Sequence, residues 1–168
     1  MTPKLDFYFR LLKSDFKACF FNNGILIINI YQKLLKKQMK QNSFGPHLTV
    51  DLIGSPTEIL QDYQLHFDWL KKLPEMIGMT PITQPYVFPY AGLVPEDRGI
   101  TGIAIIAESH LSIHSFELKS WSFIDIFSCK DFDVQSCLDW TIEWFKPQSY
   151  KWNIVERGVG FPRTVEVV

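Results

Sequence analysis

The chain has 168 residues, of which 46% are hydrophobic and 21% charged, and this composition favours one globular domain with enough apolar material for a core. A formal net charge of -1 excludes a large positive field, so we expect no nucleic-acid partner. Three cysteines without paired spacing argue against a disulfide framework and a structural zinc site, and they favour a reducing cytoplasm.

Residues 1–44 differ from the rest, and we expect them to be an extension of a domain formed by residues 45–168. The extension carries a basic stretch at residues 33–40, and its apolar positions follow approximate helical spacing. Three interpretations stay open: a peripheral amphipathic helix, a membrane-surface helix, and an extension before a natural start at Met39. The longest apolar run is too short to cross a bilayer, so no membrane partner is expected. No small-residue cleavage site follows an apolar stretch near the N-terminus, so no signal peptide is expected.

The domain is predicted to begin with a strand over residues 47–53, which are β-branched and partly alternating. The sequence Ser-Pro-Thr-Glu at residues 55–58 is typical of a capping box with proline at the first helical position, which predicts a helix over residues 56–73. Pro74 and Gly78 are expected to end this helix. Its predicted buried stripe consists of Ile59, Leu60, Tyr63, Phe67 and Leu70.

A long connection over residues 79–100 follows and is rich in proline and glycine. It contains an aromatic stretch, residues 84–90, for which two interpretations stay open. The stretch lines a pocket, or it is an extended edge segment that buries its rings. Three strands are then predicted over residues 101–107, 111–116 and 121–129, and the nearly unbroken apolar character of the first predicts a central position in the sheet.

Asp133 is expected to cap a helix that runs to about Phe145 and is ended by Pro147. A last strand is predicted over residues 150–155, followed by an exposed tail or interface arm. The element order predicts an α+β fold, a two-layer α/β sandwich with a largely antiparallel sheet and helices on one face. The predicted inward side of the second helix consists of Val134, Cys137, Leu138, Ile142 and Phe145.

Serine, histidine and cysteine, the side chains of nucleophilic and acid–base catalysis, occur together in the second half of the chain. Ser109 lies in a predicted tight turn between two strands, His114 follows on the second strand, and Cys129 ends the third. By themselves these residues are a weak signal, because a histidine or cysteine on an apolar strand is more often part of the core. No G-x-S-x-G motif surrounds Ser109, so a serine hydrolase is not indicated.

The sequence Ala-Glu-Ser-His-Leu-Ser-Ile-His at residues 107–114, with Asp-Ile-Phe-Ser-Cys at 125–129, resembles the processing site of the prokaryotic S-adenosylmethionine decarboxylase family. Residues 45–54 are similar to the opening strand of that family, and the resemblance extends over about residues 45–146. It implies a pyruvoyl-dependent decarboxylase that is made as a self-cleaving proenzyme. No metal and no added organic cofactor are implied.

The resemblance implies a cut between Glu108 and Ser109. The Ser109 hydroxyl attacks the Glu108 carbonyl, the amide becomes an ester, and β-elimination releases residues 1–108. Ser109 is left as a pyruvoyl group at the start of residues 109–168. Its ketone forms a Schiff base with a substrate amine and accepts electrons as carbon dioxide leaves.

The family's residue roles carry over to matching positions. His114 matches the histidine that acts in the elimination step, and Cys129 matches the cysteine that donates a proton after decarboxylation. Thr101 takes the place of a serine that assists processing and keeps its hydroxyl, although its β-branched side chain is stiffer. His110 is expected to point to the opposite face from Ser109 and to take no part in catalysis.

The substrate-binding part of the resemblance is less complete. Where the family reads Thr-Trp-Pro-Glu after the second histidine, this chain reads Ser-Phe-Glu-Leu at residues 115–118. Phe116, Glu117 and Phe88 are the candidate substrate-binding residues. The implied substrate is S-adenosylmethionine, whose product feeds aminopropyl groups to polyamine synthesis, including spermidine. Because Glu117 is shifted by one place, arginine or ornithine is kept as an alternative substrate.

An alternative of another class is an uncleaved, inactive partner subunit that regulates an active homologue. The joint presence of Ser109, His114 and Cys129 argues against it, because an inactive protein has no chemical need for all three. The resemblance further implies a homodimer of cleaved protomers, with each site near the subunit interface.

Overall fold

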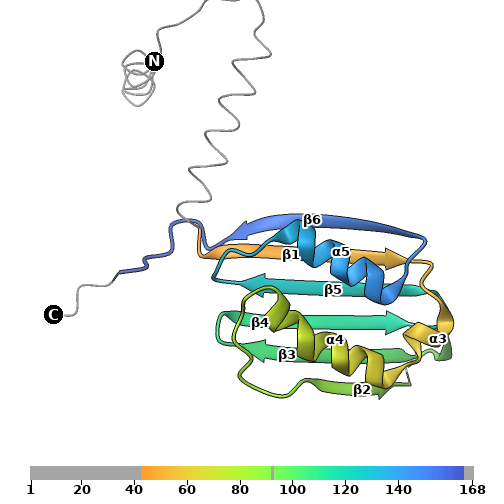
Figure 1. The fold of residues 1–168 in the computed structure, drawn as a ribbon. Coiled ribbons are helices and arrows are strands. Elements are labelled where there is room, and N and C mark those ends of the chain that lie inside the picture. The colour runs from red at the N-terminus through yellow and green to blue at the C-terminus, as the bar shows by residue number, and fades with distance from the viewer. Residues whose placement is uncertain (1–42, 92, 165–168) are drawn as a thin grey trace, which may run out of the picture. The chain divides into compact units, whose positions relative to one another are not determined.

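The structure is a computed structural model that describes residues 43–91 and 93–164, so the predicted features of residues 1–42 lie outside the described residues. This part of the chain contains both helices and strands, and the strands β3, β4 and β5 follow one another directly (Figure 1). In chain order they are β1 (Gly45–Ile53), α3 (Thr57–Leu60), α4 (Tyr63–Met76), β2 (Tyr86–Tyr90), the 3-10 helix η1 (Pro95–Asp97), β3 (Gly99–Ile106), β4 (Ser109–Phe116), β5 (Trp121–Ser128), α5 (Val134–Phe145) and β6 (Ser149–Arg157).

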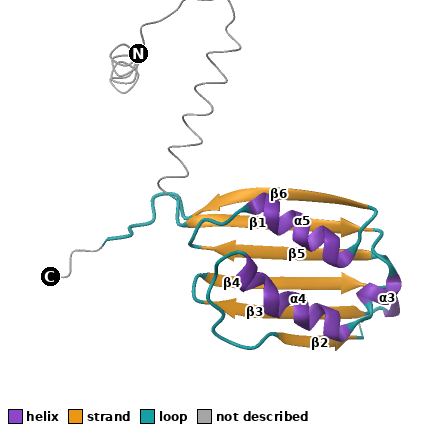
Figure 2. Ribbon diagram, in the orientation of Figure 1, coloured by secondary structure: helices purple, strands orange, loops and turns teal. Residues whose placement is uncertain are grey.

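The six strands form one sheet in the order β2-β3-β4-β5-β1-β6, and every neighbouring pair is antiparallel. Helices α4 and α5 lie side by side over one face of this sheet (Figure 2). The predicted α+β sandwich with helices on one face is therefore confirmed. The other face of the sheet, here called the open face, carries no helix from the described part of the chain.

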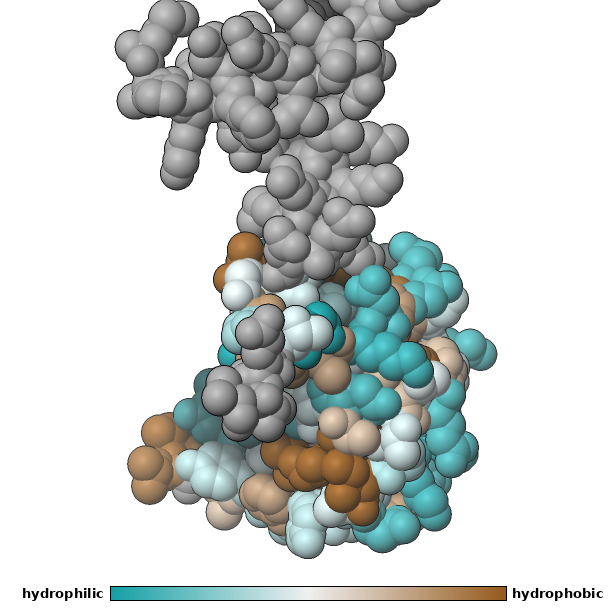
Figure 3. Space-filling view, turned by 90° about the vertical axis from the view of Figure 1, so that its left-hand side faces the viewer, coloured by the Kyte–Doolittle hydropathy of each residue, from teal (hydrophilic) through white to brown (hydrophobic). Residues whose placement is uncertain are grey.

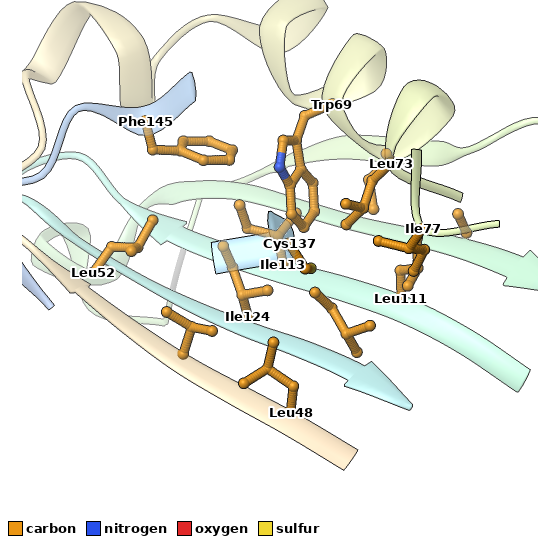
Figure 4. Packing of buried hydrophobic residues seen from close by; sticks show 14 of the residues in the cluster. Leu48, Leu52, Trp69, Leu73, Ile77, Leu111, Ile113, Ile124, Cys137 and Phe145 are labelled. Carbon is orange, nitrogen blue, oxygen red and sulfur yellow. The ribbon is translucent and has the colours of Figure 1, made fainter. Parts of the chain in front are cut away.

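The core lies between the two helices and the sheet (Figure 4). Along β1, the apolar residues Leu48, Val50 and Leu52 alternate with partly exposed ones, so a single face of the strand is buried. Trp69 of α4 and Phe145 of α5 meet above the sheet with their ring centroids 5.4 Å apart in an edge-to-face arrangement. Strand alternation and helix periodicity thus bring their apolar positions into one cluster.

The prediction of one continuous helix over residues 56–73 is wrong. The chain forms the short helix α3, turns at Gln61, and begins α4 after Asp62, whose side chain accepts a hydrogen bond from the N–H of Leu65 at 2.9 Å. The predicted capping box does not form, because α3 has no side-chain cap and the Ser55 hydroxyl is buried without a partner among the described residues. Asp62 is the better N-cap because its carboxylate reaches a free backbone N–H.

The break between α3 and α4 also changes which residues are buried, because it rotates the positions of α4 relative to those of one continuous helix. Tyr63 is 45% exposed and Phe67 is only half-buried, whereas Leu60 and Leu70 are buried as predicted. Pro74 lies inside α4 and does not end it, because the helix continues to Met76. The buried residues of α4 are His66, Trp69, Leu70, Leu73 and Pro74.

The connection over residues 79–100 contains an edge strand, β2, and the 3-10 helix η1. The aromatic stretch forms an edge segment, but it does not bury its rings: Tyr86, Phe88 and Tyr90 are exposed and Val87 is the buried residue. Strand β3 does not lie at the centre of the sheet. It is the second strand, next to the edge strand β2. Its apolar run covers both faces, and Ile105 is 36% exposed on the open face.

The second helix is confirmed at both ends. Asp133 accepts hydrogen bonds from the N–H groups of Gln135 and Ser136, at 3.0 Å and 3.2 Å, and α5 ends at Phe145. Val134 and Ile142 are partly buried, and Thr141 is an additional buried residue that the prediction lacked. The last strand is also confirmed, although it is longer than predicted. None of the helices in the described ranges is long and apolar enough to cross a membrane.

Candidate active site

The Glu108–Ser109 bond lies at the exit of the hairpin that joins β3 to β4. Residues 107–108 form the turn, and Ile106 pairs with Ser109 across it. The turn is held by Thr80: the N–H of Ala107 donates to the Thr80 carbonyl at 2.9 Å, and the N–H of Thr80 donates to the Glu108 carboxylate at 3.0 Å. The backbone on the N-terminal side of Ser109 is therefore fixed by a loop that is remote in sequence.

The Glu108 side chain is an acceptor in this arrangement. The hydrogen bond from the Thr80 backbone is the main cause that lowers the pKa of Glu108, because it favours the ionised carboxylate. The Thr80 hydroxyl donates a second hydrogen bond to the same carboxylate at 3.3 Å. Glu108 thus contributes to anchoring the turn as an ionised group.

The carbonyl oxygen of Glu108 points to the strand beside the hairpin. Ser109 pairs with Ser128 on β5, and Cys129 is the next residue. The backbone N–H of Cys129 donates a hydrogen bond to the Glu108 carbonyl oxygen at 3.0 Å. An N–H in this position polarises the carbonyl and can stabilise negative charge that develops on its oxygen during attack by a nucleophile.

The side chain that contacts Ser109 is His110, at 3.1 Å between Ser109 Oγ and His110 Nδ1. The prediction that His110 points away from Ser109 is therefore wrong for its ring, whereas the expectation that it takes no part in catalysis stays a prediction. Alternation directs the two Cβ atoms to opposite faces within a regular strand. Ser109 is the first residue of β4 after the turn, and Nδ1 is close enough to the histidine backbone to reach its neighbour.

His110 lies on the open face in a cluster of ring and charged groups. Its ring meets the ring of Phe127 edge-on, with the ring centroids 5.9 Å apart. His47 lies on the other side of Phe127, and its Nε2 atom is 3.0 Å from Oδ1 of Asp125. Burial is the main cause that lowers the pKa of His110; His47 and Arg157 lower it further, and Asp125 opposes them. The neutral imidazole is favoured.

A second group of candidate residues lies elsewhere on the open face. Thr101 of β3 and His114 of β4 are direct cross-strand partners, with 3.0 Å between Thr101 Oγ1 and His114 Nδ1. Phe88 of β2 is the partner of Thr101 on its other side, and its ring is 48% exposed. Phe88, Thr101 and His114 therefore form one row across three strands.

The two candidate substrate-binding residues at the end of β4 lie beyond this row. Phe116 packs edge-on against Phe123, with ring centroids 5.7 Å apart. Glu117 is largely shielded from solvent and forms an ion pair with the Nε atom of Arg98. Both residues lie at the opposite end of β4 from Ser109.

The structure brings Ser109 together with Glu108 and Cys129, but not with His114. Ser109 and His114 stand five positions apart on one strand, which corresponds to about 16 Å at the usual rise of a β-strand. A direct contact within one protomer is excluded by this distance. The candidate residues therefore form two half-sites: a cleavage half-site of Glu108, Ser109, His110 and Cys129, and a distal half-site of Phe88, Thr101, His114, Phe116 and Glu117.

Several functional contacts had no signal in the sequence. Thr80 lies in a loop without a motif, and the role of the Cys129 backbone N–H depends on strand register. His110 was indicated only by its place next to Ser109. Within residues 43–91 and 93–164, no three His, Cys, Asp or Glu side chains are grouped so that they could hold a metal ion.

The fold and the site define an α+β protein in which a serine follows a glutamate at a hairpin turn and a neighbouring strand polarises the carbonyl between them. Residues 46–158 match the model of the S-adenosylmethionine decarboxylase family. This match spans well over half of the chain, and the chain belongs to that family.

Named relatives agree with this assignment. The S-adenosylmethionine decarboxylase proenzyme of Archaeoglobus fulgidus is 29% identical over 115 residues, which are 68% of this chain and 97% of the relative. The proenzyme of Brevibacillus brevis is 29% identical over 129 residues, 76% of this chain and 92% of the relative. The crystal structure of the adenosylmethionine decarboxylase from Aquifex aeolicus matches with a TM-score of 0.61 at 20% identity, covering 74% of this chain and 99% of that one, which shows a common fold.

Proposed function

We propose that this protein is a self-processing, pyruvoyl-dependent S-adenosylmethionine decarboxylase that cuts itself between Glu108 and Ser109. Membership of the family supports the enzyme class. The observation that carries the proposal is the cleavage half-site, where the Glu108 carbonyl accepts the Cys129 N–H at 3.0 Å next to the Ser109 hydroxyl. This is the arrangement that an attack by Ser109 on its own backbone requires.

Cleavage proceeds in two stages that involve the chain alone. The Ser109 oxygen attacks the Glu108 carbonyl carbon, the Cys129 N–H stabilises the oxyanion, and breakage of the carbon–nitrogen bond leaves an ester with a free Ser109 amine. Removal of the Ser109 α-proton then eliminates the Glu108 carboxylate and releases residues 1–108. Tautomerisation, uptake of water and loss of ammonia turn the remaining residue into a pyruvoyl group.

The residues present fit a pyruvoyl group at position 109. Ser109 is half-buried at the start of β4, and the partly exposed Cys129 is a free thiol at the end of the neighbouring strand. A pyruvoyl ketone supplies an electron sink for loss of carbon dioxide from an amino acid. We assign to Cys129 the delivery of the proton that replaces the carboxyl group, as its place beside Ser109 supports.

We further propose a homodimer of cleaved protomers that pack through their open faces. Figure 3 views the end of the sheet that carries the β3–β4 hairpin and shows hydrophobic residues gathered on the lower part of that end. Large apolar side chains without cover are typical of an interaction surface. On the open face these side chains include Tyr86, Phe88, Tyr90, Ile105 and Phe123.

The separation of the half-sites supports a dimer of this kind. Because His114 is about 16 Å from Ser109 within one protomer, it can act on Ser109 only across an interface. A twofold axis through the open face places the distal half-site of one protomer against the cleavage half-site of the other. Thr101 orients His114 through its 3.0 Å hydrogen bond, and His114 serves the elimination step.

S-adenosylmethionine is favoured over arginine or ornithine as the substrate. The Glu117 carboxylate already pairs with the Arg98 guanidinium, so a second guanidinium or ammonium group finds no free carboxylate there. The exposed Phe88 ring beside Thr101 offers a stacking surface for a purine. We propose that the product supplies aminopropyl groups for polyamine synthesis in the cytoplasm.

The test is the intact mass of the full-length protein under denaturing conditions. Two chains, 1–108 and 109–168, with no free amine on the second, are expected from the wild type, and one chain from Ser109→Ala. Release of labelled carbon dioxide from S-adenosylmethionine, arginine and ornithine then identifies the substrate. A wild-type chain that stays intact after long incubation contradicts the proposal and favours an inactive partner subunit.

A further inference from the structure

We propose that His110 is the base of the first cleavage step: its Nδ1 takes the proton of the Ser109 hydroxyl and returns it to the departing amide nitrogen. This inference rests on the proposed self-cleavage and names a catalytic residue for it. It assigns the ester-forming step to His110 and leaves the later elimination step to His114.

The first support is the contact itself. Ser109 Oγ lies 3.1 Å from His110 Nδ1, which is hydrogen-bond distance for a hydroxyl that donates to an unprotonated ring nitrogen. The contact exists in the uncleaved chain, which is the state in which the step occurs. Once Ser109 has been converted, it has no hydroxyl, so this contact serves only the precursor.

The other histidines are engaged elsewhere. The sequence contains four, and the structure describes all of them. His66 of α4 is fully buried, and its ring contacts Ser115 and the Asp62 carbonyl. His114 contacts Thr101 in the distal half-site.

His47 is also excluded, because the Phe127 ring lies between it and His110. The ring centroid of His47 is 5.5 Å from that of Phe127, and its Nε2 atom contacts Asp125. His110 is therefore the one histidine of the chain that contacts the Ser109 hydroxyl.

The surroundings keep His110 in the form that can accept a proton. Burial lowers the pKa of His110 below the ordinary histidine value. The charged and titratable groups that face it are His47 from β1, Asp125 from β5 and Arg157 from β6. His47 and Arg157 disfavour a positive imidazole, whereas Asp125, which favours it, is already shared with His47. The neutral imidazole, which can accept a proton, is therefore favoured.

The step balances without an external reagent. The Ser109 Oγ–H bond breaks as its oxygen bonds to the Glu108 carbonyl carbon, and Nδ1 of His110 holds the proton. The negative carbonyl oxygen is stabilised by the Cys129 N–H. When the bond from this carbon to the Ser109 nitrogen breaks, the proton passes to that nitrogen, so an amide becomes an ester and an amine with no change of oxidation state.

The experiment follows self-cleavage of the full chain by intact mass in the wild type and in His110→Ala, His110→Gln, His47→Gln and His114→Ala. Hydroxylamine is the probe for the intermediate, since it cuts an ester at Ser109 but leaves an amide intact. We expect both His110 variants to cleave about 10²–10⁴-fold more slowly than the wild type and to stay whole in hydroxylamine.

Added imidazole should accelerate cleavage of His110→Ala. His114→Ala should accumulate the ester and be cut by hydroxylamine, and His47→Gln should cleave within a few-fold of the wild type.

Cleavage of His110→Ala at the wild-type rate, or an ester trapped in that variant, overturns the inference and leaves the proposed function intact. An uncut wild-type chain instead contradicts the proposed function. If the His110 variants do not fold, the pH dependence of wild-type cleavage decides: the rate should fall with acidification as one group protonates. A rate that stays constant from pH 8 to pH 4 rules out His110 as the base.

Discussion

The backbone N–H of Cys129 donates to the carbonyl oxygen of Glu108 at 3.0 Å, across the boundary between β5 and the β3–β4 hairpin. In the proposed mechanism, the main chain of Cys129 acts on the bond to be cut and its thiol delivers a proton during decarboxylation. Two stages of the proposed mechanism therefore use different atoms of one residue. The two contributions can be separated by substitution.

Cys129→Ala is expected to cleave itself at close to the wild-type rate, because alanine keeps the N–H, but to decarboxylate at least about 10²-fold more slowly. Cys129→Pro removes the N–H as well, and loss of one oxyanion donor is expected to slow cleavage about 10²–10³-fold. Intact mass measures cleavage and carbon dioxide release measures turnover. Full activity of Cys129→Ala would remove the thiol from the mechanism.

Mixed dimers test whether the two half-sites act across an interface. Ser109→Ala and His114→Ala are each expected to remain uncut when purified alone. When they are unfolded together and refolded as a mixture, mixed dimers should cleave, because one site then combines Ser109 of one protomer with His114 of the other.

The identity of the cut chain is diagnostic. Only the chain carrying His114→Ala should be cleaved, since it alone keeps Ser109, and at most about half of the mixed dimers' chains can react. Mass spectrometry distinguishes the two by their substitutions. No cleavage in the mixture, together with a monomer in sedimentation, argues against the shared site.

The hydroxyl of Thr101 is predicted to matter through His114, which it contacts at 3.0 Å. Thr101→Val removes the hydroxyl at nearly constant volume and is expected to slow processing about 10-fold or more, by loss of a hydrogen bond that orients a catalytic group. Thr101→Ser keeps the hydroxyl and should process as the wild type does. Equal rates for the two variants would limit Thr101 to a packing role.

His66 makes stability depend on pH. It is fully buried and burial lowers its pKa below 6.5, so the unfolded chain binds more protons than the folded chain at mildly acidic pH. The free energy of unfolding should therefore be constant above pH 6.5 with respect to this group and fall as pH drops toward the folded-state pKa. The slope from one group cannot exceed about 1.4 kcal/mol per pH unit.

Urea denaturation of the uncleaved Ser109→Ala protein at pH 7.5, 6.5 and 5.5 measures this slope. His66→Gln in the same background should be less stable at pH 7.5, because the contacts to Ser115 and the Asp62 carbonyl are disturbed. It should lose less stability on acidification than its parent. Equal losses would assign the pH dependence to other groups.

Local patterns in the sequence were sufficient for much of the fold. The strand at β1 follows from alternation of Leu48, Val50 and Leu52, and α5 follows from Asp133 together with its apolar period. These features depend on residues that are near one another in the chain. The candidate residues Ser109, His114 and Cys129 were assigned through the resemblance of residues 107–114 and 125–129 to the family's processing site.

Tertiary structure decided the rest, because it depends on which distant segments meet. Strand register places the Cys129 N–H on the Glu108 carbonyl and Thr80 on the Glu108 carboxylate, and neither contact has a local signature. Register also places Thr101 beside His114, while the rise along β4 keeps His114 away from Ser109. The sequence by itself determined which side chains are candidates for chemistry. The sheet decided that one protomer holds these candidates in two separate half-sites, because pairing between strands is a property of the folded chain.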